Sequence, residues 1–94
     1  MVEINGKHLK RYMCHICGYL DLEEAPWGDD GKSPSYNICD CCGVEFGYED
    51  YQETTLLTYR NEWIQKGANW FNPALKPDNW SLKQQLNNIG IQIE

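Results

Sequence analysis

The chain has 94 residues, a formal net charge of −6 and no apolar stretch long enough to cross a bilayer. An acidic chain lacks the basic surface that a phosphate backbone requires, so we expect neither a nucleic-acid partner nor a membrane role. Five cysteines, without an apolar leader-like run before them, favour metal ligation over disulfides, and we expect a cytoplasmic protein.

The length predicts one domain over residues 1–94. Three of the four tryptophans lie after Tyr48, whereas the first half holds most of the Gly and Asp residues. A segment so rich in turn-forming residues needs another source of stability. We therefore predict a metal-stabilised first half, residues 1–50, and a helical second half, residues 51–94, packed on it.

The first half reads as short extended segments joined by loops. Val2 and Ile4 on one side, and Leu9 to Met13 on the other, alternate loosely with polar residues and flank Asn5-Gly6, which favours a tight hairpin turn leading into Cys14. The segment between Cys17 and Cys39 holds prolines, glycines and an acidic run, and it is typical of a loop. The spacing of that acidic run does not match a calcium-binding EF-hand loop.

Two helices are predicted in the second half. Leu56, Tyr59 and Trp63 recur at helical spacing, and they indicate a helix over residues 51–66 that stops at Gly67. A second helix over about residues 79–89 is indicated by its apolar face, with Asp78 or Asn79 as the N-cap and Gly90 as the stop. The prolines between the two helices predict a turn or loop.

The last residues alternate like a strand. Ile91 and Ile93 flank a polar residue, and this segment can pair with residues 2–4 if the two ends of the chain meet. Taken with the helices and the hairpin, this pattern predicts a small α+β fold, with short β-strands followed by two α-helices.

The strongest signal is a duplicated cysteine pattern. The sequences CHICGY and CDCCGV both read Cys-x-x-Cys-Gly followed by an apolar residue, and a glycine after the second cysteine permits the positive φ of a tight turn. Two such turns supply four thiolates, which completes a tetrahedral site and leaves no open position for a substrate. We predict a structural zinc site, with iron as the alternative metal, formed by Cys14, Cys17, Cys39 and Cys42.

Three further residues near the cysteines have less specific roles. Cys41 takes the position that Ile16 holds in the first cluster, so the register favours Cys42 as the ligand, with Cys41 as the alternative. We interpret Cys41 as an ordinary buried thiol. His15 and His8 are expected to face solvent or to pack rather than to bind metal.

The aromatic residues of the second half are expected mainly in the core. If several of them prove exposed together, they would form an apolar patch that marks a protein contact. These residues are Trp63, Trp70, Phe71 and Trp80.

The cysteine-bearing segment resembles two families. Residues 12–44 are similar to a rubredoxin in Tyr12, Cys14, Cys17 to Tyr19, Gly28 to Gly31, Pro34 and Cys39 to Gly43. That resemblance implies a rubredoxin-like zinc-ribbon fold with the same four cysteines as ligands. The chain departs from rubredoxin in a shorter connecting loop, in Asp40 where proline is usual, and in about fifty further residues. The segment also resembles the small bacterial CPCC family in Ile38, Cys39, Cys42, Phe46, Glu49 and Asp50.

These features predict a non-enzymatic module in which a structural metal supports a surface for another protein. No acid, base or nucleophile stands in a recognisable catalytic arrangement. The acidic charge suits a basic protein partner. The alternative function is one-electron transfer at an iron site of rubredoxin type, because four cysteines bind iron in the same geometry.

Overall fold

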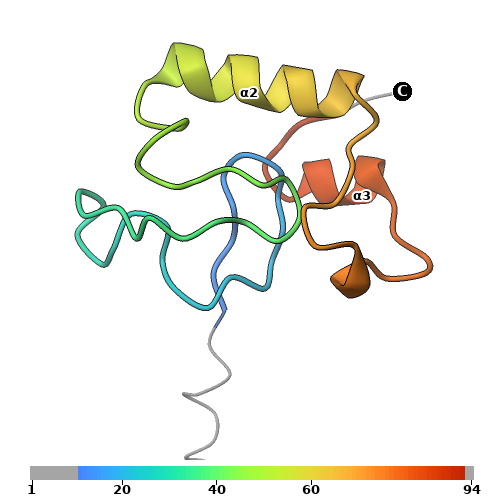
Figure 1. Cartoon of the computed structure of the whole chain (residues 1–94), viewed down its shortest axis with the longest axis horizontal. Coiled ribbons are helices and arrows are strands. Elements are labelled where there is room, and N and C mark those ends of the chain that lie inside the picture. Colours follow the sequence, from blue (N-terminus) through green and yellow to red (C-terminus); the bar gives the residue numbers. More distant parts are fainter. Residues whose placement is uncertain (1–10, 93–94) are drawn as a thin grey trace, which may run out of the picture.

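The computed structural model describes residues 11–92, in which loops and turns precede three short helical elements. These elements are the α-helix α2 (Glu53–Gln65), the 3₁₀-helix η1 (Pro73–Leu75) and the α-helix α3 (Leu82–Asn87). In Figure 1, α2 runs along one side of the looped first half and α3 lies along another. Within residues 11–92, no helix is both long and apolar enough to cross a membrane.

The predicted α+β fold is wrong, because residues 11–92 contain no β-strand. Strand pairing is limited to two isolated antiparallel bridges, one between Tyr12 and Leu22 and one between Ile38 and Glu45. At the second bridge, strand pairing stops because the chain enters a turn directly after Glu45. In that turn the backbone N–H of Tyr48 donates to the Glu45 carbonyl. The turn and first arm of the expected hairpin lie outside the described residues, and in its second arm, where residues 11–13 are described, Tyr12 forms a bridge with Leu22.

The expected pairing of the two chain ends is tested only in part. Residues 91 and 92 are described and belong to no strand, whereas residues 2–4 and 93 lie outside the described residues. After α3 the chain is instead held by a turn, in which the Ile91 N–H donates to the Leu86 carbonyl and Gly90 adopts a φ of +76°.

Helix α2 lies within the predicted range of residues 51–66. It begins at Glu53, an acidic residue in the first turn, where a carboxylate interacts favourably with the helix dipole. It ends where Gly67 takes a φ of +108° and the Ala68 N–H donates to the Trp63 carbonyl. Trp63 is the buried residue of this helix. The helix therefore covers the first half along a narrow face and leaves most of its surface in solvent.

Helix α3 is shorter than predicted, and its cap differs. The N-cap is Ser81, whose hydroxyl accepts a hydrogen bond from the Gln84 N–H, rather than Asp78 or Asn79. Leu86 is fully buried on the inner face. The three residues before Ser81 belong to the loop after η1, where the Trp80 N–H donates to the Pro77 carbonyl.

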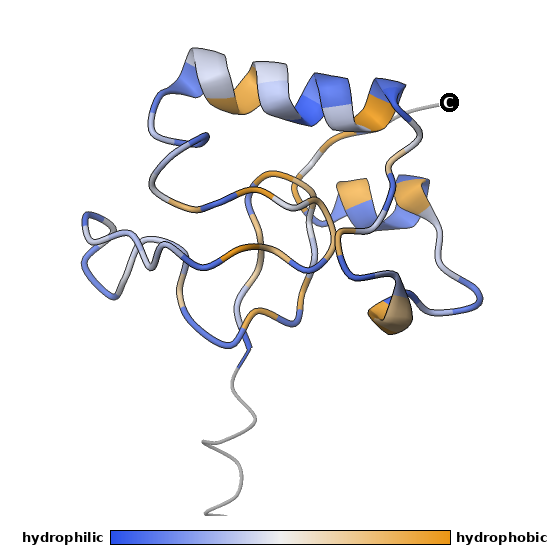
Figure 2. Cartoon of the chain, in the orientation of Figure 1, coloured by the Kyte–Doolittle hydropathy of each residue, from blue (hydrophilic) through white to orange (hydrophobic). Residues whose placement is uncertain are grey.

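The core is built from cysteines and aromatic rings rather than from aliphatic residues alone. All five cysteines are buried, and Ile16, Val44 and Phe46 pack among them. The second half contributes Trp63 and Trp70 to the same cluster, as expected for core aromatics, whereas 59% of Phe71 is exposed. Figure 2 shows hydrophobic segments of the first half gathered at the centre of the molecule. Both halves thus share one apolar cluster, whose centre is the cysteine-bearing segment.

Candidate metal centre

Two tight turns with the same backbone present the cysteines. We call residues 14–19 the first knuckle and residues 39–44 the second knuckle. In the first, the Gly18 N–H donates to the Cys14 carbonyl and the Cys14 N–H to the Tyr19 carbonyl, at N···O distances of 2.8 Å. In the second, the Gly43 N–H donates to the Cys39 carbonyl at 2.9 Å. The duplicated sequence therefore folds into a duplicated turn.

Both turns depend on a glycine after the second cysteine. Gly18 has a φ of +85° and Gly43 a φ of +80°, in the left-handed region that residues with a Cβ rarely adopt. These conformations fulfil the prediction that the two glycines permit the turns.

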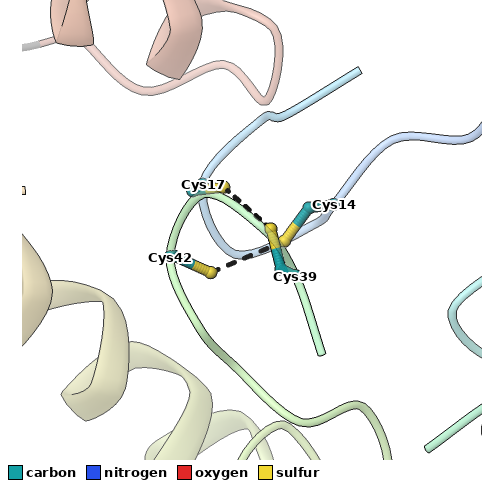
Figure 3. Close-up of side chains that lie close together, drawn as sticks. All are labelled: Cys14, Cys17, Cys39 and Cys42. Atoms are coloured by element: carbon teal, nitrogen blue, oxygen red, sulfur yellow. Dashed lines mark hydrogen bonds between the residues drawn. The ribbon is translucent and has the colours of Figure 1, made fainter. Parts of the chain in front are cut away.

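The two knuckles bring the four predicted ligands together. The Sγ atoms of Cys14, Cys17, Cys39 and Cys42 all lie within 4.8 Å of one another, and all four residues are buried. The Sγ atoms of Cys14 and Cys42 are 3.9 Å apart, and those of Cys17 and Cys39 are 3.7 Å apart. Figure 3 shows the four side chains converging on one point, two from each turn. That these cysteines bind a metal stays a prediction.

The sulfur spacing fits a tetrahedral metal ion. Zinc binds thiolate sulfur at about 2.3 Å, and a regular tetrahedron with that radius has edges of about 3.8 Å. The two measured distances lie on either side of this edge. A disulfide needs sulfurs about 2 Å apart, and all five cysteines are free thiols. The cluster therefore has the donor set of a closed four-thiolate site, into which zinc and iron both fit.

The thiols interact electrostatically with one another. Burial raises the pKa of the Cys42 thiol. Hydrogen bonds with neighbouring thiols, first that with Cys14, raise the pKa of Cys17 and lower that of Cys39. A divalent cation would favour thiolates at all four positions, because its charge offsets the cost of burying theirs.

Side chains from both helices hold the carbonyls of the first knuckle. Arg60 of α2 donates through Nη2 to the His15 carbonyl at 2.8 Å and through Nε to the Ile16 carbonyl at 2.7 Å. Gln85 of α3 donates to the Cys17 carbonyl, and the Asn88 side chain donates to the Gly18 carbonyl at 2.9 Å. Four consecutive carbonyls therefore point away from the sulfurs, while the Ile16 N–H points toward Cys14 Sγ at 3.4 Å.

The carbonyls of the second knuckle are held mainly by backbone. The Asn72 N–H donates to the Asp40 carbonyl and the Phe71 N–H to the Cys41 carbonyl, at 2.8 and 2.9 Å. The Tyr59 hydroxyl of α2 donates to the Cys42 carbonyl at 2.8 Å. The segment before η1 therefore lies along the second knuckle like a short extra strand, although it makes no ladder.

Close packing against α3 adds a second requirement for glycine in the first knuckle. A Cβ on Gly18 would lie 2.3 Å from the Gln85 carbonyl oxygen, a backbone atom that cannot rotate away. A Cβ on Gly43 would meet the Phe71 side chain at 3.2 Å, and that side chain can move. The first knuckle is thus the more tightly enclosed of the two.

Cys41 lies outside the four-sulfur cluster. It is fully buried, and its Sγ accepts a hydrogen bond from the Gln85 amide at 3.3 Å. The position is consistent with the register of the two knuckles, which favours Cys42 as the ligand. Gln85 connects Cys41 to the Cys17 carbonyl and to the Trp80 indole, which donates to Gln85 Oε1 at 2.7 Å.

The structure pairs His15 of the first knuckle with Asp50, which directly precedes the predicted helix over residues 51–66. His15 Nε2 lies 2.6 Å from Asp50 Oδ2, and 40% of the His15 side chain is exposed. The Asp50 carboxylate is fully buried and also accepts from the Trp27 indole and the Gly47 N–H. This buried carboxylate ties the acidic loop and the chain before α2 to the first knuckle. His8 lies outside the described residues.

Sequence reasoning found the four cysteines and missed the residues that support them. Arg60, Gln85 and Asn88 carry no motif, because each acts through a carbonyl that is far away in the sequence. The one available signal was indirect: carbonyls of a tight turn need donors, and both helices carry polar side chains at their inner faces.

Comparisons with known proteins identify two relatives in Bacillus subtilis (strain 168). The chain is 32% identical over 84 residues to YozI, with 73% of this chain and 69% of the relative covered. It is 35% identical over 83 residues to YoaQ, with 73% of this chain and 70% of the relative covered. Both relatives are described as uncharacterized proteins. No protein-family model and no solved structure matches the chain, so the resemblances to rubredoxin and to the CPCC family are not confirmed.

Proposed function

We propose that this chain, which belongs to the family of YozI and YoaQ, is a non-enzymatic zinc-binding module whose four-cysteine site is structural. Zinc is the proposed metal and Cys14, Cys17, Cys39 and Cys42 are the proposed ligands. In this proposal the metal fixes the two knuckles, and the fixed surface contacts another protein.

The observation that carries the proposal is the closed sulfur cluster. Four buried thiols lie within 4.8 Å of one another, and two of the pairs have the spacing of a tetrahedral zinc site, so a bound ion would have no open position for water or substrate. Catalytic zinc sites keep such a position, whereas structural sites do not. A site of this kind supports folding directly, because metal binding and folding share one free energy.

The packing around the cluster supports a structural role. The core consists of the cysteines themselves and the residues pressed against them, and the helices reach the knuckles through Arg60, Gln85 and Asn88. Loss of the ion would therefore release both helices from their anchor points. The five free cysteines suit a reducing compartment, and we place the protein in the cytoplasm as part of this proposal.

The test is metal analysis of the full chain purified without added metal, followed by chelation. We expect one zinc ion per chain, no visible colour and a large fall in melting temperature when a chelator is added. A red protein that contains one iron per chain and changes colour on reduction would overturn the zinc proposal in favour of electron transfer. A melting curve that is unchanged by complete metal removal would overturn the structural role.

A further inference from the structure

Two neighbouring hollows share Tyr19 and Asp21 as wall residues. We call the first, of about 350 Å³, the aromatic hollow, because Trp70 and Trp80 also line it. We call the second, of about 520 Å³, the acidic hollow, and Leu75 lines it from η1. Both volumes fall within the range of ligand sites. The side chains of this surface take no part in the four-sulfur cluster.

The aromatic hollow has the construction of a cation site. The Trp70 ring lies 5.5 Å from the Tyr19 ring and 5.6 Å from the Trp80 ring, centroid to centroid, at interplanar angles of 89° and 83°. This edge-to-face packing fixes the three rings against one another, and an aromatic face that borders the hollow attracts an ammonium ion. Trp70 is 8% exposed, and its Nε1 donor has no hydrogen-bond partner within the described residues.

One ring of this hollow already interacts with an ammonium group. The Lys76 Nζ atom lies 5.4 Å from the centroid of the Trp80 ring. This distance is within the range of a cation–π interaction. The contact shows that the Trp80 ring attracts a primary ammonium, although Lys76 itself does not line the aromatic hollow.

The acidic hollow extends the negative surface away from the rings. It is lined by four carboxylate residues, namely Asp21, Glu23, Glu24 and Asp40, together with one cationic residue, Arg11. Ile38 and Leu75 also line it, and 46% and 50% of these two side chains are exposed. Carboxylates beside exposed aliphatic groups match a segment with basic and apolar side chains, and the net charge of −6 favours its approach.

We propose that the aromatic hollow and the acidic hollow together form the docking surface for a lysine-bearing basic segment of a partner protein. One lysine ammonium enters the aromatic hollow beside Asp21, and the neighbouring basic side chains lie over the carboxylates of the acidic hollow. This inference rests on the proposed function, which includes a protein partner, and it specifies the chemistry of that partner. A free organic ammonium compound shares only the chemistry of the aromatic hollow.

The ligand side of the proposal is tested with peptides and the metal-loaded full chain. The probe is a short peptide with a central lysine flanked by arginine and leucine, titrated while tryptophan fluorescence is recorded. Replacing the central lysine with norleucine removes the ammonium group but keeps the four-carbon stem, and we expect affinity to fall about two- to thirtyfold. A trimethyl-lysine peptide should bind at least as tightly, since a cation–π contact needs no N–H donor. Weaker binding of the trimethyl-lysine peptide would overturn the role of the aromatic hollow.

The protein side is tested with single charge changes. Asp21→Asn should weaken the lysine peptide about two- to fivefold, the magnitude of an exposed ion pair. Lys76→Gln should strengthen it slightly, because the loss of a positive charge beside Trp80 lowers the repulsion of a basic peptide. Glu53→Gln is the matched control, since it makes the same charge change on α2, away from both hollows. Equal effects of Asp21→Asn and Glu53→Gln would overturn the assignment of the site.

The outcomes separate this inference from the proposed function. A fully metallated, folded chain that does not distinguish the lysine peptide from the norleucine peptide overturns the docking surface and leaves the structural metal intact. Saturable binding of tetramethylammonium, without tighter binding of the peptide, overturns the partner protein in favour of a small amine. Metal analysis and melting curves, recorded on the same samples, report on the metal proposal independently.

Discussion

The two knuckles have the same backbone turn but are supported in different ways. The first is held by side chains of Arg60, Gln85 and Asn88, which donate to four consecutive carbonyls. The second is held by the backbone N–H groups of Phe71 and Asn72, with one side-chain donor, Tyr59. A backbone donor survives most substitutions, whereas a side-chain donor is lost with its residue. The first knuckle is therefore the one that single substitutions can damage.

The difference follows from where the helices lie. Helix α3 is so close to the first knuckle that a Cβ on Gly18 would overlap the Gln85 carbonyl. The second knuckle is instead flanked by the extended segment before η1, which brings its own N–H groups. The two knuckles thus share one sequence pattern but pack against different elements. Matched pairs of substitutions, one in each knuckle or its support, can measure how much each contact contributes to stability.

The largest effect is expected from replacing a cysteine of the four-sulfur cluster, the feature that the two knuckles share. Cys14→Ser and Cys39→Ser should each abolish stoichiometric metal binding and unfold both knuckles. A structural zinc ion contributes about 10 kcal/mol or more, which is comparable to the whole stability of a small domain. Metal content and far-ultraviolet circular dichroism measure the result. Cys41→Ser is the control and should keep the metal. A Cys14→Ser chain with full metal content and an unchanged melting curve would contradict the four-cysteine site.

The next comparison concerns the two glycines. Gly18→Ala should cost about 3 kcal/mol or more, because strain at positive φ is combined with a backbone clash. Gly43→Ala should cost only about 1–2 kcal/mol, because the Phe71 side chain can move. Urea denaturation in excess metal measures both free energies of unfolding. Equal costs would show that α3 does not enclose the first knuckle as described.

The third comparison uses neighbouring residues of α2. Arg60→Met removes two charged hydrogen bonds from the first knuckle, and we expect a loss of about 2–3 kcal/mol. Tyr59→Phe removes one hydrogen bond from the second knuckle and should cost about 0.5–1.5 kcal/mol. Lys66→Met controls for the loss of a positive charge on this side of the molecule. The unfolding free energies are measured as for the glycines, and a larger loss for Tyr59→Phe would reverse the ranking of the two knuckles.

The smallest expected effects come from two asparagines. Asn88→Ala removes the side-chain donor to the Gly18 carbonyl and should cost about 1 kcal/mol. Asn72→Ala leaves its backbone donor to the Asp40 carbonyl in place and should change stability by no more than about 0.5 kcal/mol. Thermal unfolding of the metal-loaded variants is sufficient to compare them. Equal shifts of the melting temperature in the two variants would contradict the claim that side-chain and backbone donors to the knuckle carbonyls differ in how easily they are lost.

Local patterns predicted some of the fold correctly and some of it wrongly. The helical periodicity around Tyr59 and Trp63 placed α2 within two residues at its start and one at its end. The second helix was predicted too long, because Ser81 and not Asp78 or Asn79 provides the cap. The β-strands were wrong within the described residues: the alternation at residues 91–93 predicted a strand, but residues 91 and 92 belong to none, and strand pairing is limited to two isolated bridges. Alternation alone does not say whether a partner backbone continues alongside.

The sequence by itself determined the four-cysteine constellation, because Cys-x-x-Cys-Gly is a local pattern and its turn needs only nearby backbone atoms. Only the tertiary structure decided which side chains hold each turn. Arg60 and Gln85 are 44 and 68 residues from the carbonyls of Ile16 and Cys17 that they bind. Such hydrogen bonds depend on how whole elements pack against each other, and the local sequence around each residue does not predict them.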